Sequence, residues 1–134
     1  MAKYKKKLDA DIRCPLEYGL TIFGGKSGEY PQKLYKALMN SQTVLTVWDD
    51  ARLVGLIRVL DDSEMLAQIH YVLVHPEYQG QGIAGRMVEY IKEKYKNFMY
   101  LELMPEDKNN VPFYEKHGFH VMENRAAMQI CNIN

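Results

Sequence analysis

The stretch Val72-Leu-Val-His-Pro-Glu-Tyr-Gln-Gly-Gln-Gly-Ile-Ala84 decides more about this chain than any other part of its sequence. The apolar run 69–74 predicts a strand, which leads through a turn at Pro76 into a glycine-rich loop and then an amphipathic helix. The N–H groups at a helix N-terminus lack intrahelical acceptors, and the helix dipole favours an anion there. Gly80 and Gly82 have no Cβ, so a phosphate can approach their main chain closely. The sequence therefore predicts a loop that holds a pyrophosphate.

Two common phosphate-binding patterns do not describe this loop. A Walker loop ends in Gly-Lys-Ser/Thr, and that ending is absent here. Gly80, Gly82 and Gly85 have the spacing Gly-x-Gly-x-x-Gly of a dinucleotide-binding loop. The acidic residue about twenty positions further on would be Glu102, which lies inside the next predicted strand rather than at its end. A glycine loop that only turns the chain is the structural alternative.

The loop and a second segment resemble one protein family. Gln79, Gly82 and Ala84 match Gln/Arg-x-x-Gly-x-Gly/Ala, the pyrophosphate loop of the GNAT family of N-acetyltransferases. Pro112-Phe-Tyr-Glu-Lys-His-Gly-Phe119 resembles the later Phe-Tyr-Glu-Lys-x-Gly-Phe segment of that family. The two blocks stand in the family's order, about thirty residues apart. By this resemblance, which covers about residues 28–134, the chain is identified as a member of the GNAT family.

The periodicity of the remaining sequence predicts a compatible order of elements. Three consecutive strands are expected to form an antiparallel meander, because their connections are too short for crossovers. The helix after the glycine loop then serves as a crossover to a parallel strand. The fold class is α/β (α+β), a GNAT-like mixed, mostly antiparallel sheet with helices on both faces, in a single acetyltransferase domain over 1–134. The predicted strands are 43–48, 53–60, 65–74, 98–103, 119–122 and 126–130, and the predicted helices are 31–39, 83–95 and 111–117.

The composition is that of an ordinary globular protein. The chain has 134 residues, of which 47% are apolar and 25% are charged, and its 17 basic residues balance its 17 acidic ones. Nothing global therefore indicates nucleic acid or an anionic membrane as a partner. The lysines within residues 3–7 are interpreted as a solvated, frayed terminus. No run is long enough to span a membrane.

The cysteines indicate a reducing compartment. Cys14 and Cys131 lie near opposite ends of the chain without metal-type spacing, so no metal is expected. Cys131 is interpreted as a small apolar residue in the last strand. The basic start is followed by Asp9 and Asp11 rather than an apolar run, so it is not read as a signal peptide. The expected location is the cytoplasm.

The N-terminal segment 1–26 is atypical. Residues 11–26 resemble the opening of HxlR-type winged-helix regulators, although Ser27 follows where a tryptophan is usual and no winged-helix body lies downstream. DNA binding is therefore not carried over to this chain. Residues 18–23 could supply the first strand, or the segment could be helical and pack elsewhere.

The resemblance implies that acetyl-CoA donates an acetyl group to a primary amine, which attacks the thioester directly. The pyrophosphate would bind the loop, and the pantetheine arm would pair along the edge of the strand ending at Val74. The residues expected to bind the coenzyme are Val72, Leu73, Val74, Gln79, Gly80, Gln81, Gly82, Ile83, Ala84, Gly85 and Asn110. For Asn110, capping the following helix is the alternative role.

The resemblance also gives catalytic candidates. Tyr114 matches the family tyrosine that points at the coenzyme sulfur, where it would protonate the departing thiolate, and a core aromatic is the alternative. Many relatives have an acidic residue where this chain has Tyr71, so the base is open among His70, Glu102, Glu64, a water chain and selection of the neutral amine. His70 and Tyr71 are neighbours in a strand, and period-two alternation predicts that they face opposite ways.

The acceptor is a small-molecule or protein amine that the sequence does not identify. The alternative function is an acyl-CoA-binding sensor or regulatory module with little or no turnover, which the departure at Tyr71 favours. No nucleic acid and no membrane is expected as a partner. A homodimer is a plausible assembly, since the edge of a mixed sheet offers a seam.

Overall fold

The structure is a computed structural model that describes residues 2–5 and 29–133. Its backbone contacts divide the chain into two compact units, Met1–Leu103 and Met104–Asn134, and each unit is described by itself. In the described part of the chain, no helix is both long enough and apolar enough to cross a membrane.

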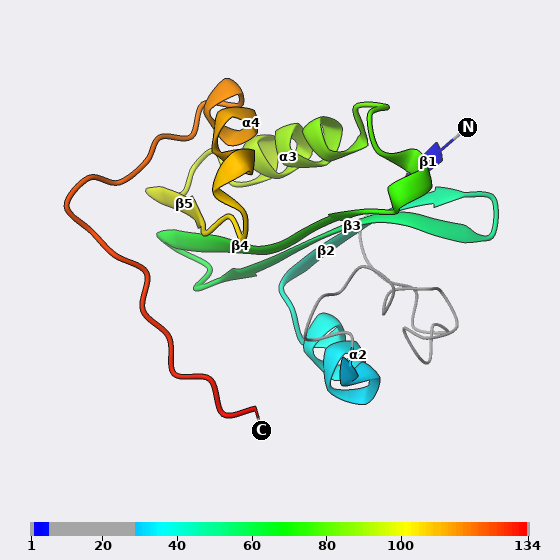
Figure 1. Ribbon diagram of the computed structural model, residues 1–134, viewed down its shortest axis with the longest axis horizontal. Helices are drawn as coiled ribbons and strands as arrows, with labels where there is room; N and C mark the ends of the chain where they lie inside the picture. Colours follow the sequence, from blue (N-terminus) through cyan, green and yellow to red (C-terminus); the bar gives the residue numbers. More distant parts are fainter. Residues whose placement is uncertain (1, 6–28, 134) are drawn as a thin grey trace. The chain divides into compact units, whose positions relative to one another are not determined.

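The first unit is built on a five-stranded sheet in the order β1-β2-β3-β4-β5 (Figure 1). The second, third and fourth strands are joined by short turns and pair antiparallel, which confirms the predicted meander. The last strand pairs parallel with the fourth after the α3 crossover, as expected. The strands are β1 Ala2–Lys5, β2 Thr43–Asp49, β3 Arg52–Asp61, β4 Leu66–Val74 and β5 Tyr100–Leu103.

The prediction of a frayed N-terminus is wrong for residues 2–5. They form β1, which pairs antiparallel with β2, and Lys3 lies opposite Trp48 in the ladder. Lysine is a common residue of edge strands because its charge discourages pairing with further chains. The reading of 18–23 as the first strand falls outside the described residues.

Helices cover both faces of the sheet, as predicted (Figure 1). On one face, α2 (Pro31–Met39) buries Leu34 and Leu38 in a cluster that includes Leu56 of β3. On the other, α3 (Ile83–Lys94) packs so closely that a Cβ added to Gly55 would lie 3.1 Å from Ile83 Cγ2. Neighbouring residues of β3 therefore pack against opposite helices, which is the alternation expected of a strand buried on both sides.

Buried polar contacts hold the end of α3 to the sheet. Tyr95, the C-cap of α3, donates its hydroxyl to Asp61 Oδ2 at 2.6 Å, and its oxygen lies 2.6 Å from Thr43 Oγ1. Because the tyrosine donates to the carboxylate, the threonine hydroxyl donates to the tyrosine. Burial, with the Asp61 carboxylate adding to it, raises the pKa of Tyr95 to about 12. The helix is thus tied to the ends of two strands, β2 and β3.

The second unit contains η4 (Lys108–Asn110) and α4 (Val111–Lys116), so the predicted short helix is confirmed. Gly118 follows it with φ 94°, a left-handed conformation that glycine adopts without strain. The N–H of Phe119 then donates to Tyr114 O at 3.1 Å, which closes the helix end.

The two strands predicted at 119–122 and 126–130 are absent: residues 119–133 contain no strand. A strand exists only where a neighbouring strand offers ladder bonds, and period-two patterning cannot report whether a neighbour is available. Met128 and Ile130 are instead 93% and 87% exposed. The placement of Cys131 in the last strand is wrong for the same reason, since this residue is exposed in irregular chain.

Replacing Tyr95 by phenylalanine is expected to lower the free energy of unfolding by about 1–2 kcal/mol, because Thr43 and Asp61 each lose a buried partner. The folded pKa of Tyr95 lies above the unfolded value of about 10. Its contribution is therefore complete below about pH 10 and is lost as the pH rises towards 12. Urea unfolding of both proteins at about pH 8 and about pH 11 should show the difference shrinking at the higher pH. A difference that grows with pH would contradict this account.

Candidate active site

The glycine-rich loop has an open main chain. It follows η3 (Pro76–Tyr78), and Gly80 and Gly82 have φ of 82° and 81°, in the left-handed region. A Cβ added to either glycine would meet nothing within 4 Å. The loop therefore needs glycine for its backbone conformation and presents its main chain to solvent.

The N-terminus of α3 supplies hydrogen-bond donors to this loop. The first helical bond runs from Arg86 N to Gly82 O at 3.1 Å. The N–H groups of Ile83, Ala84 and Gly85 precede that bond and have no intrahelical acceptor. Ile83 also buries its side chain against Gly55 of β3, which anchors the helix start. These donors beside an exposed main chain fit a pyrophosphate, which needs several N–H groups and close approach.

The loop is tied to the end of β4. Gln79 donates its side-chain amide to Val74 O at 3.2 Å. At the same end, His75 N donates to Val54 O at 2.8 Å. The predicted residues 72–74 and 79–85 are therefore joined within one unit, as coenzyme binding requires.

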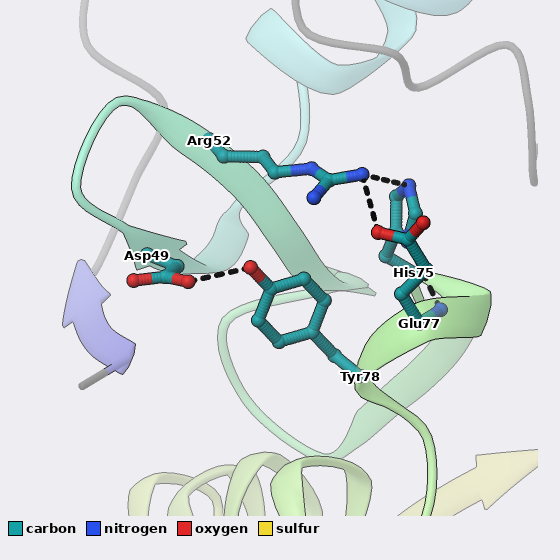
Figure 2. A network of polar contacts seen from close by, with 5 residues as sticks. All are labelled: Asp49, Arg52, His75, Glu77 and Tyr78. Carbon is teal, nitrogen blue, oxygen red and sulfur yellow. Dashed lines mark hydrogen bonds and ion pairs between the residues drawn. The ribbon is translucent and has the colours of Figure 1, made fainter.

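A network of polar side chains holds the turn before the loop (Figure 2). Tyr78 reaches from η3 to the end of β2 and donates to Asp49 Oδ2 at 2.5 Å. Arg52, at the start of β3, lies 2.8 Å from Glu77 Oε2 and 3.2 Å from His75 Nε2. Glu77 N also donates to His75 Nδ1 at 3.2 Å. The β2–β3 hairpin thus fixes the turn from which the loop starts.

The roles of Asp49 and Arg52 in this network were not predicted from the sequence. The predicted strands 43–48 and 53–60 place both residues in the connection between them, and pairing with residues so far along the chain leaves no local pattern. His75 caps η3, because its side chain accepts from Glu77 N. The Asp49 carboxylate accepts the Tyr78 proton and thereby raises the pKa of Tyr78.

The pairing of β4 with β5 ends partway along β4. Residues 66–69 of β4 pair with β5, whereas pairing with β3 continues to Val74, opposite Gly55. From His70 onward, β4 has no β5 partner. The predicted pantetheine-binding residues 72–74 lie on this edge, which an extended ligand can join as a strand, although Val74 O already accepts from Gln79. Their side chains are half-buried, and Leu73 packs against the α2 cluster.

A bulge in β4 overturns the expectation that His70 and Tyr71 face opposite ways. Tyr71 pairs with Arg58 and Ile69 pairs with Val59, which leaves His70 as the extra residue. The rings of His70 and Tyr71 lie 4.3 Å apart between centroids. Both contact Arg58, so they lie on the same side of the sheet. Strict alternation holds only in a regular ladder, and one inserted residue cancels it.

Arg58 is the centre of this group. Its Nη1 lies 2.6 Å from His70 Nδ1, its Nε donates to Ser41 Oγ at 2.7 Å, and its guanidinium lies 5.7 Å from the centre of the Tyr71 ring. Partial burial lowers the pKa of Arg58 from its usual value, and Tyr71 opposes that shift. A guanidinium only donates, so His70 Nδ1 accepts and carries no proton. His70 could therefore act as a base at Nδ1 only after the bond to Arg58 breaks.

The other base candidates lie elsewhere in the first unit. Glu64 is exposed in the turn before β4, and Glu102 is a half-buried residue of β5 opposite Gln68. Among the residues described, no group of three or more His, Cys, Asp or Glu side chains is arranged to hold a metal ion.

In the second unit, Tyr114 lies on α4 between two phenylalanines. Its ring meets Phe113 edge-on at 5.0 Å and Phe119 at 6.0 Å between centroids. Burial raises the pKa of Tyr114, which keeps its hydroxyl protonated at neutral pH. Asn110 is the N-cap of α4 but its side chain makes no capping bond, and Asp107 instead accepts from Asn109 N at 2.9 Å. The alternative capping role of Asn110 is therefore not seen.

A model of a known protein family also matches the sequence. The model described as "Acetyltransferase (GNAT) family" matches residues 16–119, well over half of the chain. The chain belongs to the GNAT acetyltransferase family. The match begins at residue 16 rather than near 28, so it includes part of the atypical N-terminal segment, which lies outside the described residues.

Two curated relatives are themselves uncharacterised N-acetyltransferases. One, from Bacillus methanolicus, is 34% identical over 117 residues, which are 87% of this chain and 92% of that protein. The other, a ycf52-like protein from Prochlorococcus marinus, is 29% identical over 108 residues, 75% of this chain. This chain spans 60% of the length of that second relative.

Solved structures share the GNAT acetyltransferase fold. A probable acetyltransferase from Staphylococcus aureus aligns with a TM-score of 0.81 at 29% identity, over 98% of this chain and 99% of that one. A GNAT acetyltransferase from Elizabethkingia anophelis, solved with acetyl-CoA bound, aligns with a TM-score of 0.68 at 17% identity, over 91% and 78% of the two chains. At that identity the second likeness shows the fold alone.

Removing the Tyr78 hydroxyl is expected to loosen the turn before the loop. In Tyr78→Phe, the N–H of Tyr78, which donates to His75 O at 2.8 Å, should exchange its hydrogen faster, because the turn loses its bond to Asp49. Amide hydrogen exchange followed by mass spectrometry checks this. Tyr90→Phe, a half-buried tyrosine of α3, is the matched control and should leave peptides covering 75–82 unchanged. Equal exchange rates in the two variants would mean that the network does not hold the turn before the loop.

Proposed function

We propose that this acetyltransferase transfers the acetyl group of acetyl-CoA to a primary amine, which attacks the thioester directly. The observation that carries the proposal is the combination, in one unit, of an open glycine loop at the start of α3 with an open edge on β4. A pyrophosphate and an extended pantetheine arm need these two features side by side. Membership in the GNAT family and a fold neighbour with acetyl-CoA bound give further support.

When bound, acetyl-CoA supplies an activated acetyl group as a thioester. The N–H groups of the loop and of the first turn of α3 would hold its pyrophosphate, at the positive end of the helix dipole. The main chain of 72–74 would pair with the pantetheine along the β4 edge. A main-chain N–H near the bulge would hydrogen-bond the thioester oxygen, where negative charge develops during attack.

Proton transfer needs a base for the amine and an acid for the sulfur. A lysine-like amine has a pKa near ~10, so most of it is protonated at neutral pH. His70 is the proposed base, provided that its bond to Arg58 gives way, and selection of the neutral amine is the route that needs no base. Tyr114 is the proposed acid for the departing thiolate, since a tyrosine hydroxyl is protonated at neutral pH before reaction.

A second candidate function is an acyl-CoA-binding sensor with little turnover. It is favoured by the engagement of His70 Nδ1 with Arg58 and by the absence of a carboxylate at Tyr71. Coenzyme binding would be the same under both functions. Release of coenzyme thiol across a panel of amines distinguishes them, because a sensor would release none. The cytoplasmic location, the amine partner and a homodimer stay predictions.

Coenzyme binding is tested by a pair of variants at Gly82. Asparagine and aspartate have nearly the same size, and both tolerate left-handed backbone better than most residues. Gly82→Asp should abolish binding, because it sets a negative charge against the pyrophosphate, whereas Gly82→Asn should weaken it less. Calorimetric titration with acetyl-CoA, and with desulfo-CoA as a second ligand, measures both. Binding that is equal in the two variants would mean that the loop does not hold the pyrophosphate.

The role of Tyr114 is tested by Tyr114→Phe. Turnover should fall by roughly 10²-fold or more, while the dissociation constant for acetyl-CoA changes little, because the hydroxyl acts on the leaving sulfur and not in binding. Stopped assays of thiol release give the first quantity and calorimetry the second. Full turnover in this variant would return Tyr114 to an aromatic packing role.

A further inference from the structure

Arg58 is a half-buried cation that has no acidic partner among residues 2–5 and 29–133. Its contacts are the hydroxyl of Ser41, the imidazole of His70 and the face of the Tyr71 ring, all of them formally neutral groups. Every ion pair of the described residues that involves an arginine or lysine side chain lies elsewhere, and none includes Arg58. Withdrawing a guanidinium from water without a counter-charge is unfavourable, so such a group is a strong site for an incoming anion.

The donors of Arg58 are also incompletely used. A guanidinium has five N–H groups in a fixed fork, and the described contacts occupy Nε and one bond at Nη1. Nη2 makes no hydrogen bond within the described part of the chain. The Nη2 side of the fork can therefore bind the oxygens of a carboxylate or a phosphate while Ser41 and His70 hold the other groups in place.

The guanidinium of Arg58 lies beside the part of β4 that has no β5 partner. Arg58 pairs across the ladder with Tyr71, the residue that follows the bulge. Its guanidinium leans over β4, because it contacts both His70 and the Tyr71 ring. An extended ligand on the open edge of β4 would therefore lie about one strand spacing, ~5 Å, from this group. That separation is within the length of a small amine that also bears an anionic group.

We propose that Arg58 binds an anionic oxygen group, a carboxylate or a phosphate, on the amine that accepts the acetyl group. The acceptor is then a small amine with its own negative charge, such as an amino acid or an aminoalkyl phosphate, and not a polyamine. This rests on the proposed function. Ser41, which accepts from Nε, acts as a positioning residue that sets the direction of the guanidinium fork, and His70 holds Nη1 until it acts as the base.

Matched pairs of amines test this selectivity. Histidine with histamine and ornithine with putrescine differ by a carboxylate, and phosphoethanolamine with ethanolamine differ by a phosphate. In each pair, the anionic member is the amine that carries the carboxylate or phosphate, and the neutral member is the amine that lacks it. The measurement is the ratio of kcat/KM for the anionic member over that for the neutral member, from thiol release. The native enzyme should favour the anionic member of one class by about tenfold or more, and the class favoured identifies the anion. No preference in any pair would overturn the proposal.

Variants at Arg58 separate ligand binding from a structural role. Arg58→Gln should abolish the preference while the affinity for acetyl-CoA stays nearly unchanged. Releasing His70 Nδ1 in this variant changes kcat/KM for both members of a pair alike, so the ratio reports the anion site alone. Arg58→Lys should keep part of the preference, because the charge remains and the fork is lost. Arg125→Gln, an exposed arginine of the second unit, removes the same charge and should leave the ratio unchanged. An equal loss for both members of each pair in Arg58→Gln would make Arg58 structural.

A binding measurement keeps the inference testable if no amine is acetylated. The NMR signal of the Arg58 Nε–H, assigned by its loss in Arg58→Gln, is followed as histidine, histamine, phosphoethanolamine and ethanolamine are added without acetyl-CoA. The signal should shift with an anionic amine and not with its neutral partner. Absence of thiol release together with this shift would remove the proposed function and keep the anion site. Thiol release from neutral amines, with no shift of the Nε–H signal for any anionic amine, would keep the proposed function and remove the anion site.

Discussion

The open edge of β4 is the constraint on which the rest of the first unit depends. A central strand normally satisfies both of its edges, yet β4 loses its β5 partner after Ile69 while β3 continues beside it to Val74. Unpaired main-chain groups in a sheet need another partner, and an extended ligand supplies one. The bulge at His70 marks the point where this pairing changes, and the strand then runs directly into the turn before the glycine loop. Edge, bulge and loop thus form one continuous binding surface along the main chain.

This surface can hold one extended ligand only if the glycine loop begins at a fixed position relative to β4. The main chain around Gly80 and Gly82 is exposed and makes few contacts of its own, so its direction is set from both ends. On one side, Tyr78 and the Arg52 pairs bind the preceding turn to the β2–β3 hairpin. On the other, Ile83 is buried against Gly55, so closely that a Cβ at residue 55 would lie 3.1 Å from Ile83 Cγ2. The loop itself can then remain open to a ligand at little cost in stability.

The sequence predicted the parts of this arrangement that depend on local chemistry. Helix periodicity, the glycine loop and the Gly118 helix end all follow from neighbouring residues, and the structure confirms these elements. The bulge at His70 was missed because nothing in the sequence distinguishes an inserted residue from a regular one, and the facing of every later residue in the strand depends on it. The strands expected after Gly118 failed for a related reason, since strand patterning is satisfied only where a partner edge exists. What escaped prediction was pairing between distant segments.

The same bulge links the departure at Tyr71 to the charge of Arg58. The resemblance to the GNAT family implies an acidic residue where this chain has Tyr71, and Tyr71 is the cross-strand partner of Arg58. A carboxylate there would lie beside the guanidinium and neutralise it, since directly opposed unlike charges attract across a ladder. The tyrosine instead offers the face of its ring, which stabilises the cation without consuming its hydrogen-bond donors. Losing the carboxylate removes a base from the site, but it also leaves a half-buried cation ready for an external anion. An acceptor that brings its own carboxylate or phosphate would restore the missing charge pair each time it binds.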